Sequence, residues 1–287
     1  MTLKMAVPNK GRLNERAVEL LLKSGLDLGE EWGRKLYINV INQDIEVMFV
    51  RAQDIPVFVA GGAIDIGITG IDQIAESGED VERLLDLDFG HCRLSVAVPE
   101  ASGITGTDDI KNGCRVATSF PKLTKEFFDS KKKKVNIVNV SGAAEIMPHM
   151  GISDIIVDLV SSGSTLKTNR LVSIDDIIVS QAVIVGNKRS IKSKKDAVSG
   201  IVSSIKSVIE AENKKYLMAD IPKKKLKDVQ KMFPGVAGPT VMNIAGRDDM
   251  VAMHVVIDRK DVYDSVNTLK KMGAKGILTL PIDRLVP

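Results

Sequence analysis

The sequence predicts an α/β protein with two lobes and a smaller third domain at the C-terminal end. Short apolar segments of strand length alternate with amphipathic segments of helix length along most of the 287 residues, which is typical of a mainly parallel sheet covered by helices. A chain of this length is also too long for one ordinary hydrophobic core. After residue 213 the order becomes strand, helix, strand, strand, helix, strand, which is the ferredoxin-like pattern. We expect lobe I over residues 1–90 and 186–212, lobe II over 91–185, and the third domain over 213–287.

Lobe I begins with this alternation. Residues 3–9 are expected to form a strand, and residues 13–25 an amphipathic helix that ends at Gly25. A short helix is expected to start at Asp54, an N-cap type of residue followed by a proline in the first turn. Asp72 is expected to open the next helix. The other strand predictions in lobe I are 35–41, 45–51 and 64–70.

Lobe II repeats the alternation. The predicted strands are apolar and rich in β-branched residues, and they cover 92–100, 115–121, 135–142, 152–160 and 175–187. Helices are expected at 122–132 and 143–151. A longer helix over roughly 190–213 is expected to return to lobe I.

The third domain has its own sequence of elements. Its predicted strands are 216–222, 240–246, 250–258 and 275–282. Its predicted helices are 223–233, which ends before Pro234-Gly235, and 260–273, which ends at a glycine. A module of this order at the end of an α/β enzyme more often regulates or oligomerises than catalyses.

Composition and charge exclude several classes of function. The formal net charge is only +3 and aromatic residues make up 4% of the chain, so neither a strongly basic surface nor a stacking platform for nucleic acid is expected. No apolar segment is long enough to span a bilayer, and the first residues lack the apolar core of a signal peptide. Cys92 and Cys114 have no disulfide or metal-binding spacing. These observations predict a cytoplasmic protein without a nucleic-acid or membrane partner.

Residues 157–169, VDLVSSGSTLKTN, are the most informative segment. An apolar strand meets Asp158, and a loop of small residues rich in hydroxyl groups follows before a helix can begin. Successive backbone N–H groups in such a loop can converge on a phosphate, because small side chains let the main chain approach it closely. The spacing of a Walker motif is absent, and a plain polar turn accounts for the loop equally well. Asp158 adds a group that a turn does not need, able to accept from sugar hydroxyls or to hold Mg²⁺.

The spacing of Glu145, Gly151, Asp158, Ser162-Gly163 and Thr165-Leu166 resembles the signature of the ATP phosphoribosyltransferase family. Segments similar to that family occur in family order along essentially the whole chain, namely PNKGRL (8–13), VRAQDIP (50–56), DIGITGIDQ (65–73), FGHCRLSVAVPE (89–100) and GAKGILTLPID (273–283). The third domain resembles the regulatory domain of the long form of the family, which needs no separate regulatory subunit.

The resemblance implies an enzyme that transfers phosphoribose from phosphoribosyl pyrophosphate to N1 of the adenine of ATP. Pyrophosphate is the leaving group and Mg²⁺ is required. The implied fold is a two-lobed, periplasmic-binding-protein-like catalytic core followed by a ferredoxin-like (ACT-like) regulatory domain. Histidine is the implied feedback inhibitor, and the implied assembly is a homo-oligomer, dimer to hexamer.

The resemblance also assigns roles around the loop. The 5′-phosphate of phosphoribosyl pyrophosphate is expected in a cradle of backbone amides from Ser161, Ser162, Gly163, Ser164 and Thr165. Asp158 and Glu145 are expected near the ribose, with Asp158 as the Mg²⁺ ligand. For Glu145, an ordinary helix acid is the alternative.

Three basic residues near predicted strand ends, Lys10, Arg12 and Arg51, are expected to neutralise the pyrophosphate and the phosphates of ATP. Strand ends are where open α/β sheets bind ligands, although each residue taken singly also fits a surface salt bridge. Arg12 and Asp72 are the residues expected to contact ATP, and a simple N-cap is the alternative for Asp72. No covalent nucleophile is implied, because positioning and electrostatic stabilisation suffice for this transfer.

Three residues of the third domain are expected to bind histidine. Asp220, at the end of a predicted strand, can accept from a cationic or N–H group, and Thr240 can bond the polar backbone groups of the effector. Gly276 leaves room beside them. A plain strand-end charge before Pro222 is the alternative for Asp220.

A solute-binding module is the competing hypothesis, because two α/β lobes around a cleft also describe periplasmic-type receptors and their cytosolic sensor relatives. The missing signal peptide and the missing helix-turn-helix segment count against it. Formation of an adenine adduct from ATP, phosphoribosyl pyrophosphate and Mg²⁺ would separate the two hypotheses.

Overall fold

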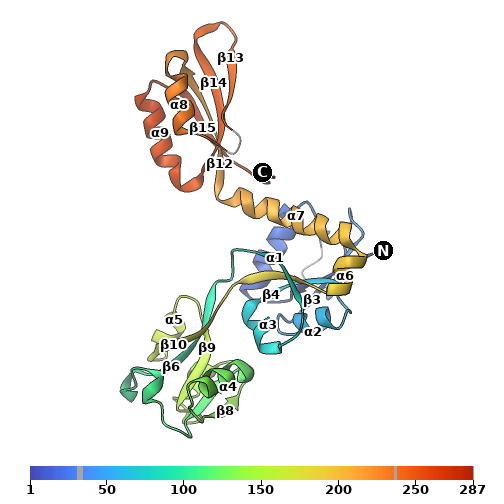
Figure 1. The fold of residues 1–287 in the computed structure, drawn as a ribbon, viewed down its shortest axis with the longest axis vertical. Helices are drawn as coiled ribbons and strands as arrows, with labels where there is room; N and C mark the ends of the chain where they lie inside the picture. The colour runs from blue at the N-terminus through green and yellow to red at the C-terminus, as the bar shows by residue number, and fades with distance from the viewer. Residues whose placement is uncertain (31–34, 236–237, 287) are drawn as a thin grey trace. The chain divides into compact units, whose positions relative to one another are not determined.

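The structure is a computed structural model of the chain, and it describes residues 1–30, 35–235 and 238–286 (Figure 1). The chain divides into two compact units. They are Met1–Glu19 with Leu26–Val202, and Leu20–Gly25 with Ser203–Pro287. The first unit contains the two α/β lobes, and the second contains the C-terminal domain.

Lobe I is built on a six-stranded sheet with the order β2-β3-β1-β4-β11-β5. The strands are β1 (Leu3–Pro8), β2 (Tyr37–Asn39), β3 (Ile45–Val50), β4 (Ile66–Gly70), β5 (Glu82–Asp86) and β11 (Ala182–Gly186). Strands β1, β3 and β4 are parallel, and β4 is buried along its whole length. This is the burial expected of a central parallel strand covered on both faces. The helices of this lobe include α1 (Arg12–Lys23), α2 (Ile55–Ala60) and α3 (Ile71–Ser77).

Lobe II is built on a five-stranded sheet with the order β10-β6-β9-β7-β8. The strands are β6 (Cys92–Pro99), β7 (Arg115–Thr118), β8 (Asn136–Asn139), β9 (Ile155–Val160) and β10 (Leu171–Ser180). Strands β7, β8 and β9 are parallel. Helix α4 (Pro121–Ser130) buries Phe128 against Leu94, Val96 and Val157, and the short helix α5 (Ser164–Thr168) follows β9. The α/β class predicted for residues 1–212 is therefore confirmed.

Some predicted elements of the lobes are wrong. The single strand expected at 175–187 is two strands, because β10 pairs in the sheet of lobe II while β11 pairs with β4 and β5 in the sheet of lobe I. The helix expected at 143–151 is only a 3₁₀ turn, Ala144–Ile146, which agrees with the helix-breaking Pro148 that follows. Asp54 stands at the N-cap position of α2 but makes no capping hydrogen bond through its side chain.

The long helix predicted at 190–213 is also interrupted. It is divided into α6 (Lys188–Ser193) and α7 (Lys195–Glu212). Asn187 caps α6, since its Oδ1 accepts from the N–H groups of Arg189 at 2.9 Å and Ser190 at 3.1 Å. The boundary between the two compact units falls inside α7, at Val202, ten residues before the predicted domain boundary.

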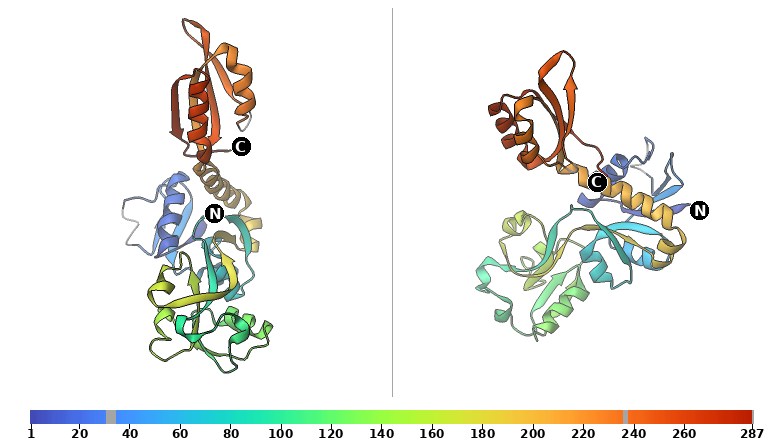
Figure 2. Two further views of the ribbon diagram at one scale, coloured as in Figure 1. Left: turned by 90° about the vertical axis from the view of Figure 1, so that its left-hand side faces the viewer. Right: turned by 45° about the horizontal axis from the view of Figure 1, so that its top comes forward.

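The C-terminal domain has the predicted element order. Strands β12 (Lys214–Pro222), β13 (Thr240–Ile244), β14 (Arg247–Asp258) and β15 (Lys275–Pro281) form an antiparallel sheet with the order β13-β14-β12-β15. Helices α8 (Leu226–Met232) and α9 (Val262–Lys271) lie on the same face of this sheet (Figures 1 and 2). The ferredoxin-like prediction is confirmed.

The two faces of the C-terminal sheet differ in composition. Toward the helices, the side chains of Leu217, Ile221 and Met253 pack with Val229 and Leu269 into one apolar core. The intervening residues of each strand point to the opposite face because side chains alternate along a strand. The residues that the structure describes include no helix with the length and apolar character needed to cross a bilayer.

Candidate active site

The small-residue loop follows a central strand of lobe II. Ile155, Ile156 and Val157 of β9 are fully buried, because β9 lies between β6 and β7 in the sheet. The strand leaves the sheet at Val160, and the loop of residues 161–163 begins there. Burial of the strand therefore holds the start of the loop in place, at the carboxyl end of the parallel strands β7 and β9, where α/β proteins bind ligands.

A cavity of about 420 Å³ is located at this loop. It is lined by Ala143, Glu145, Asp158, Leu159, Val160, Ser161, Ser162, Gly163, Thr165 and Leu166. The structure thus brings together six of the seven residues predicted to bind phosphoribosyl pyrophosphate. The seventh, Ser164, begins α5 and is not among the lining residues.

Gly163 gives the loop its turn. Its backbone is left-handed, with φ +76° and ψ 3°, and it is the N-cap of α5. A Cβ placed on Gly163 would have Val160 Cγ1 as its nearest described neighbour, at 3.9 Å. The free chain therefore has room for a side chain here, and the requirement for glycine comes from the backbone conformation.

The hydroxyl groups of the loop hold its shape. The Oγ atoms of Ser162 and Ser164 are 3.0 Å apart, and the Ser164 N–H donates weakly to Ser162 Oγ at 3.4 Å. Ser161 Oγ donates to the His91 carbonyl at 3.2 Å. The first N–H groups of α5 have no carbonyl within the helix to bond, so they can bond an anion. With only five residues, α5 offers individual amides and little macrodipole.

Asp158 is a half-buried carboxylate that forms no ion pair with any described residue. Burial raises its pKa because desolvation disfavours the charged form, and the neighbouring charge of Glu145 raises it further, while the Leu159 N–H lowers it. That N–H donates to Asp158 Oδ1 at 2.8 Å. A bound cation or a hydroxyl donor would relieve this unfavourable environment.

Glu145 reaches the cavity from a strained segment. It lies in the 3₁₀ turn after Ala143, which is left-handed with φ +54° although it has a side chain. Such a conformation costs of order 1 kcal/mol or more and is often found at functional sites. Prediction of an ordinary helix around Glu145 missed both the turn and the role of Ala143 in the cavity wall.

The basic residues of lobe I lie where parallel strands end. Strands β1 and β3 run in register to Pro8 and Val50, and the Asn9 N–H donates to the Val50 carbonyl at 2.8 Å. Lys10 and Arg51 follow these two strand ends, and both are exposed. Neither forms an ion pair with the residues described here, so the alternative of a surface salt bridge has no partner among them. The prediction for the Arg12 side chain lies outside the described part of the chain.

Asp72 is buried and internally bonded. Ser180 Oγ donates to its Oδ1, and Gln73 Nε2 donates to its Oδ2 at 2.6 Å. The Asp72 N–H in turn donates to Ser180 Oγ at 3.1 Å. These bonds join the start of α3 to the end of β10. The N-cap of α3 is Gly70, so the N-cap alternative for Asp72 is wrong.

The two carboxylates of the cavity suit a metal ion that binds together with a substrate. Among the residues in the described ranges, no three His, Cys, Asp or Glu side chains are grouped to hold a metal. Glu145 and Asp158 line the same cavity. Mg²⁺ commonly takes one or two carboxylates and completes its shell with substrate phosphates and water. The pair therefore fits Mg²⁺ bound through a pyrophosphate, and does not fit a closed protein cage.

The three residues predicted to bind histidine lie in the C-terminal sheet. Asp220 pairs with Ala252, and Thr240 pairs with His254, so Asp220 and Thr240 point to the same face of the sheet, opposite the helices. Gly276 is beside Asp220, because a Cβ placed on it would lie 3.4 Å from Asp220 Oδ2. On the same face, Tyr216 Oη is 2.8 Å from His254 Nδ1, a pair that sequence reasoning did not identify.

Comparison with known proteins identifies the family of the chain. Residues 51–207 match the family model described as "HisG: ATP phosphoribosyltransferase", and residues 211–284 match "HisG, C-terminal domain". An ATP phosphoribosyltransferase of Methanocaldococcus jannaschii is 46% identical over 285 residues, which are 98% of this chain and 99% of that protein. One from Natronomonas pharaonis is 44% identical over 285 residues, covering 99% of this chain and all of that protein.

A solved structure supports the same conclusion. The ATP phosphoribosyl transferase (HisG:HisZ) complex from Thermotoga maritima contains a chain that is 32% identical, with a TM-score of 0.66. The match covers 99% of that chain and 73% of this one, so part of this chain has no counterpart there. On the family models and on the relatives matched over nearly its full length, the chain belongs to the ATP phosphoribosyltransferase family, the enzymes of the first step of histidine biosynthesis.

Proposed function

We propose that the cavity at the end of β9 is the phosphoribosyl pyrophosphate site of an ATP phosphoribosyltransferase. The enzyme joins phosphoribose to N1 of ATP and releases pyrophosphate. The observation that carries the proposal is that Glu145 and Asp158 meet in one cavity with four residues of the predicted loop, Ser161, Ser162, Gly163 and Thr165. The family membership favours an enzyme over a solute-binding module.

The loop binds the 5′-phosphate in this proposal. The N–H groups at the start of α5 supply the hydrogen bonds, and the hydroxyl groups of Ser161, Ser162, Ser164 and Thr165 surround them. The left-handed Gly163 turns successive amides toward one point, as in other anion-binding loops. Side chains of this size leave the main chain accessible to phosphate oxygens.

Asp158 and Glu145 bind the ribose and its magnesium ion. Burial and the charge of Glu145 raise the pKa of Asp158, and the Leu159 N–H offsets this only in part. Mg²⁺ or ribose hydroxyl groups supply further compensation when the substrate binds. Mg²⁺ would neutralise charge on the departing pyrophosphate.

Lys10, Arg12 and Arg51 bind the phosphate groups of both substrates. Lys10 and Arg51 are exposed at the ends of β1 and β3, and the absence of a described ion-pair partner leaves their charges available. Their positive charge stabilises the negative charge that develops on pyrophosphate as the glycosyl bond breaks. No covalent intermediate on the protein is required.

The C-terminal domain binds histidine as a feedback inhibitor in this proposal. The region of Asp220, Thr240 and Gly276 offers a carboxylate, a hydroxyl and open space on the face of the sheet that the helices leave uncovered. A zwitterionic amino acid needs such polar partners, since burying it without them is costly. Inhibition by a molecule unlike either substrate would act through domain or subunit arrangement, in a homo-oligomer of two to six chains.

One assay tests the proposed reaction. The protein is mixed with ATP, phosphoribosyl pyrophosphate and Mg²⁺, and the ultraviolet absorbance of the adenine adduct is followed. Absorbance should rise only when all three are present, and pyrophosphate should appear in equal amount. Binding of both substrates without adduct formation would instead support a solute-binding module.

A further inference from the structure

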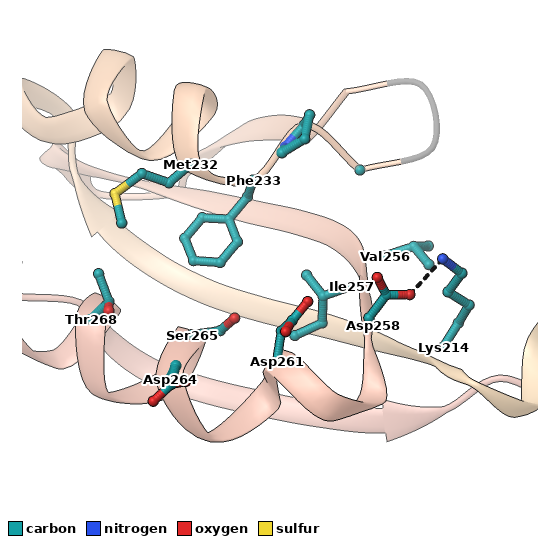
Figure 3. Close-up of a pocket in the computed structure, with 12 residues that line it drawn as sticks. Lys214, Met232, Phe233, Val256, Ile257, Asp258, Asp261, Asp264, Ser265 and Thr268 are labelled. Atoms are coloured by element: carbon teal, nitrogen blue, oxygen red, sulfur yellow. Dashed lines mark hydrogen bonds and ion pairs between the residues drawn. The ribbon is translucent and has the colours of Figure 1, made fainter.

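The C-terminal domain contains a second cavity, of about 410 Å³, between the end of α8 and the first turns of α9 (Figure 3). This volume is within the range of small-molecule sites. All its lining residues come from residues 214–268, and Asp220, Thr240 and Gly276 are not among them. It is therefore separate from the region proposed for histidine and from the cavity of lobe II.

The floor of this cavity is apolar. Phe233 and Ile257 line it, and both belong to the buried core of the domain. Figure 3 shows the ring of Phe233 facing the space above α9. An occupant therefore needs an apolar body, since water gains little against such a surface.

A serine hydroxyl without a described partner lines the cavity. Ser265 on α9 is only 7% exposed, and its side chain faces the space between α9 and Phe233 (Figure 3). It makes no hydrogen bond with any residue in the ranges that the structure describes. Ser265 Oγ is not one of the fully enclosed side-chain atoms without a partner, so it is open to the cavity and can bond an occupant. An occupant with a polar hydrogen would satisfy this oxygen.

The wall of the cavity is negatively charged. Asp258, Asp261 and Asp264 line it together with Lys214, which gives −3 + 1 = −2. Lys214 Nζ is already paired with Asp258 Oδ1 at 2.6 Å. Asp261 and Asp264 form no ion pair with a described residue and are exposed. Two carboxylates therefore remain available on the side of the cavity formed by α9.

From the apolar floor, the unbonded Ser265 hydroxyl and the two free carboxylates, we propose that this cavity binds a small organic cation, an amine carried on an apolar body of about amino-acid size. The ammonium group lies against Asp261 and Asp264, and one of its hydrogens bonds Ser265. The body packs on Phe233 and Ile257. An anion of the same shape is repelled, and a neutral analogue loses the charge-assisted hydrogen bonds.

Three probes with the same aromatic body test the charge preference on the full-length protein. They are 2-phenylethylamine, 2-phenylethanol and phenylacetate, each titrated by calorimetry and by shifts of backbone amide resonances in α9. The amine should bind at least tenfold more tightly than the alcohol, and phenylacetate should not bind. Equal affinity for amine and alcohol, or shifts outside the C-terminal domain only, would overturn the proposal.

A matched pair of charge variants locates the site. The double variant Asp261→Asn/Asp264→Asn should weaken the amine at least tenfold, since both free carboxylates are removed. The double variant Asp228→Asn/Asp248→Asn removes the same charge from exposed positions outside the cavity and should bind as the wild type does. Equal weakening in both would show a general effect of charge and would contradict the site.

Ser265→Ala separates a binding hydroxyl from a structural one. Without a partner in the free domain, its removal should leave the melting temperature unchanged or raise it, and amine affinity should fall severalfold. A lower melting temperature with unchanged affinity would show that the hydroxyl only supports the fold. Thr268→Val is the control variant, because it removes the other α9 hydroxyl that lines the cavity. It should change affinity less than Ser265→Ala does.

Discussion

The cavity at the end of β9 and the cavity between α8 and α9 have nearly the same volume, about 420 and 410 Å³, but different walls. In lobe II a strand end supplies a loop of amides and hydroxyl groups, with little side-chain bulk. In the C-terminal domain two helices supply an apolar floor and carboxylates on side chains. Helix backbones are satisfied internally, so helices recognise ligands mainly by side chains, whereas a loop at a strand end can use its main chain.

The carboxylates of the two cavities differ in the same way. Burial and Glu145 raise the pKa of Asp158, while the hydrogen bond from Lys214 lowers the pKa of Asp258. Asp258 is paired with Lys214 within the domain, whereas Asp158 has no ion-pair partner among the described side chains. In the proposed function, the lobe II site obtains its compensating cation from the substrate, as a magnesium pyrophosphate would provide.

The largest expected effect is that of Asp158→Asn, which removes the charge that we propose binds ribose and Mg²⁺. We expect kcat/KM for phosphoribosyl pyrophosphate to fall by about 10³-fold. Asp108→Asn, an exposed acid of the same lobe, is the matched control and should be unaffected. Steady-state kinetics with varied Mg²⁺ provide the measurement. An Asp158→Asn enzyme with wild-type kinetics would remove this carboxylate from the site.

Arg51→Ala should have the next largest effect, because it removes one cation from the stabilisation of developing negative charge. Turnover should fall by on the order of 10²-fold, and Arg51→Lys should recover only part, since a point charge does not replace a planar fork. Arg189→Ala on α6 is an exposed control. Unchanged turnover in Arg51→Ala would assign this residue to the surface.

Asp220→Ala examines the C-terminal domain at the region proposed for histidine, outside the cavity between α8 and α9. We expect it to retain catalysis and to lose most inhibition by histidine, with at least a tenfold higher concentration for half inhibition, on the order of one lost charge-assisted hydrogen bond. Activity is measured over a range of histidine concentrations beside Asp248→Asn, an exposed acid of the same domain. Inhibition at the wild-type concentration would place the effector elsewhere.

Gly163→Ala should raise KM for phosphoribosyl pyrophosphate roughly tenfold and KM for ATP much less, because the loop amides would shift. Gly103→Ala is a close control, since Gly103 is also left-handed, with φ +69° and no described atom within 4 Å of an added Cβ. Both variants should lose about 1 kcal/mol of stability. A rise in KM shared by both would show that strain alone is responsible.

The smallest expected effect is on stability, and its sign opposes the effect on activity. A carboxylate whose folded-state pKa is raised holds its proton more tightly when folded, so its contribution to stability falls as pH rises from the unfolded pKa through the folded one. Asp158→Asn should therefore melt at a higher temperature than the wild type near pH 8. The difference should shrink below the unfolded pKa of about 4. Melting curves at both pH values measure it.

Helices and strands were predictable where the apolar residues of a segment follow one clear period, that of a helix or that of a strand. The strand of Ile155 to Val157 and the helix around Phe128 follow from local apolar pattern, and both form as expected. Prediction was wrong where the structure of a short segment depends on the strands with which it pairs. Residues 175–187 are divided at Gln181 because successive strands pair in different sheets, and no local property of that apolar run contains this information.

The sequence by itself determined the fold class, the order of elements in the C-terminal domain, and the loop of small residues after Asp158, because periodicity and residue size are local properties. Only the tertiary structure decided which side chains lie close together and which are buried. It placed Glu145 beside Asp158, buried Asp72 against Ser180, left Lys10 and Arg51 without a described ion partner, and faced Ser265 toward Phe233. Burial and the charge of Glu145 raise the pKa of Asp158. Burial and through-space charge both depend on residues that are distant in the chain.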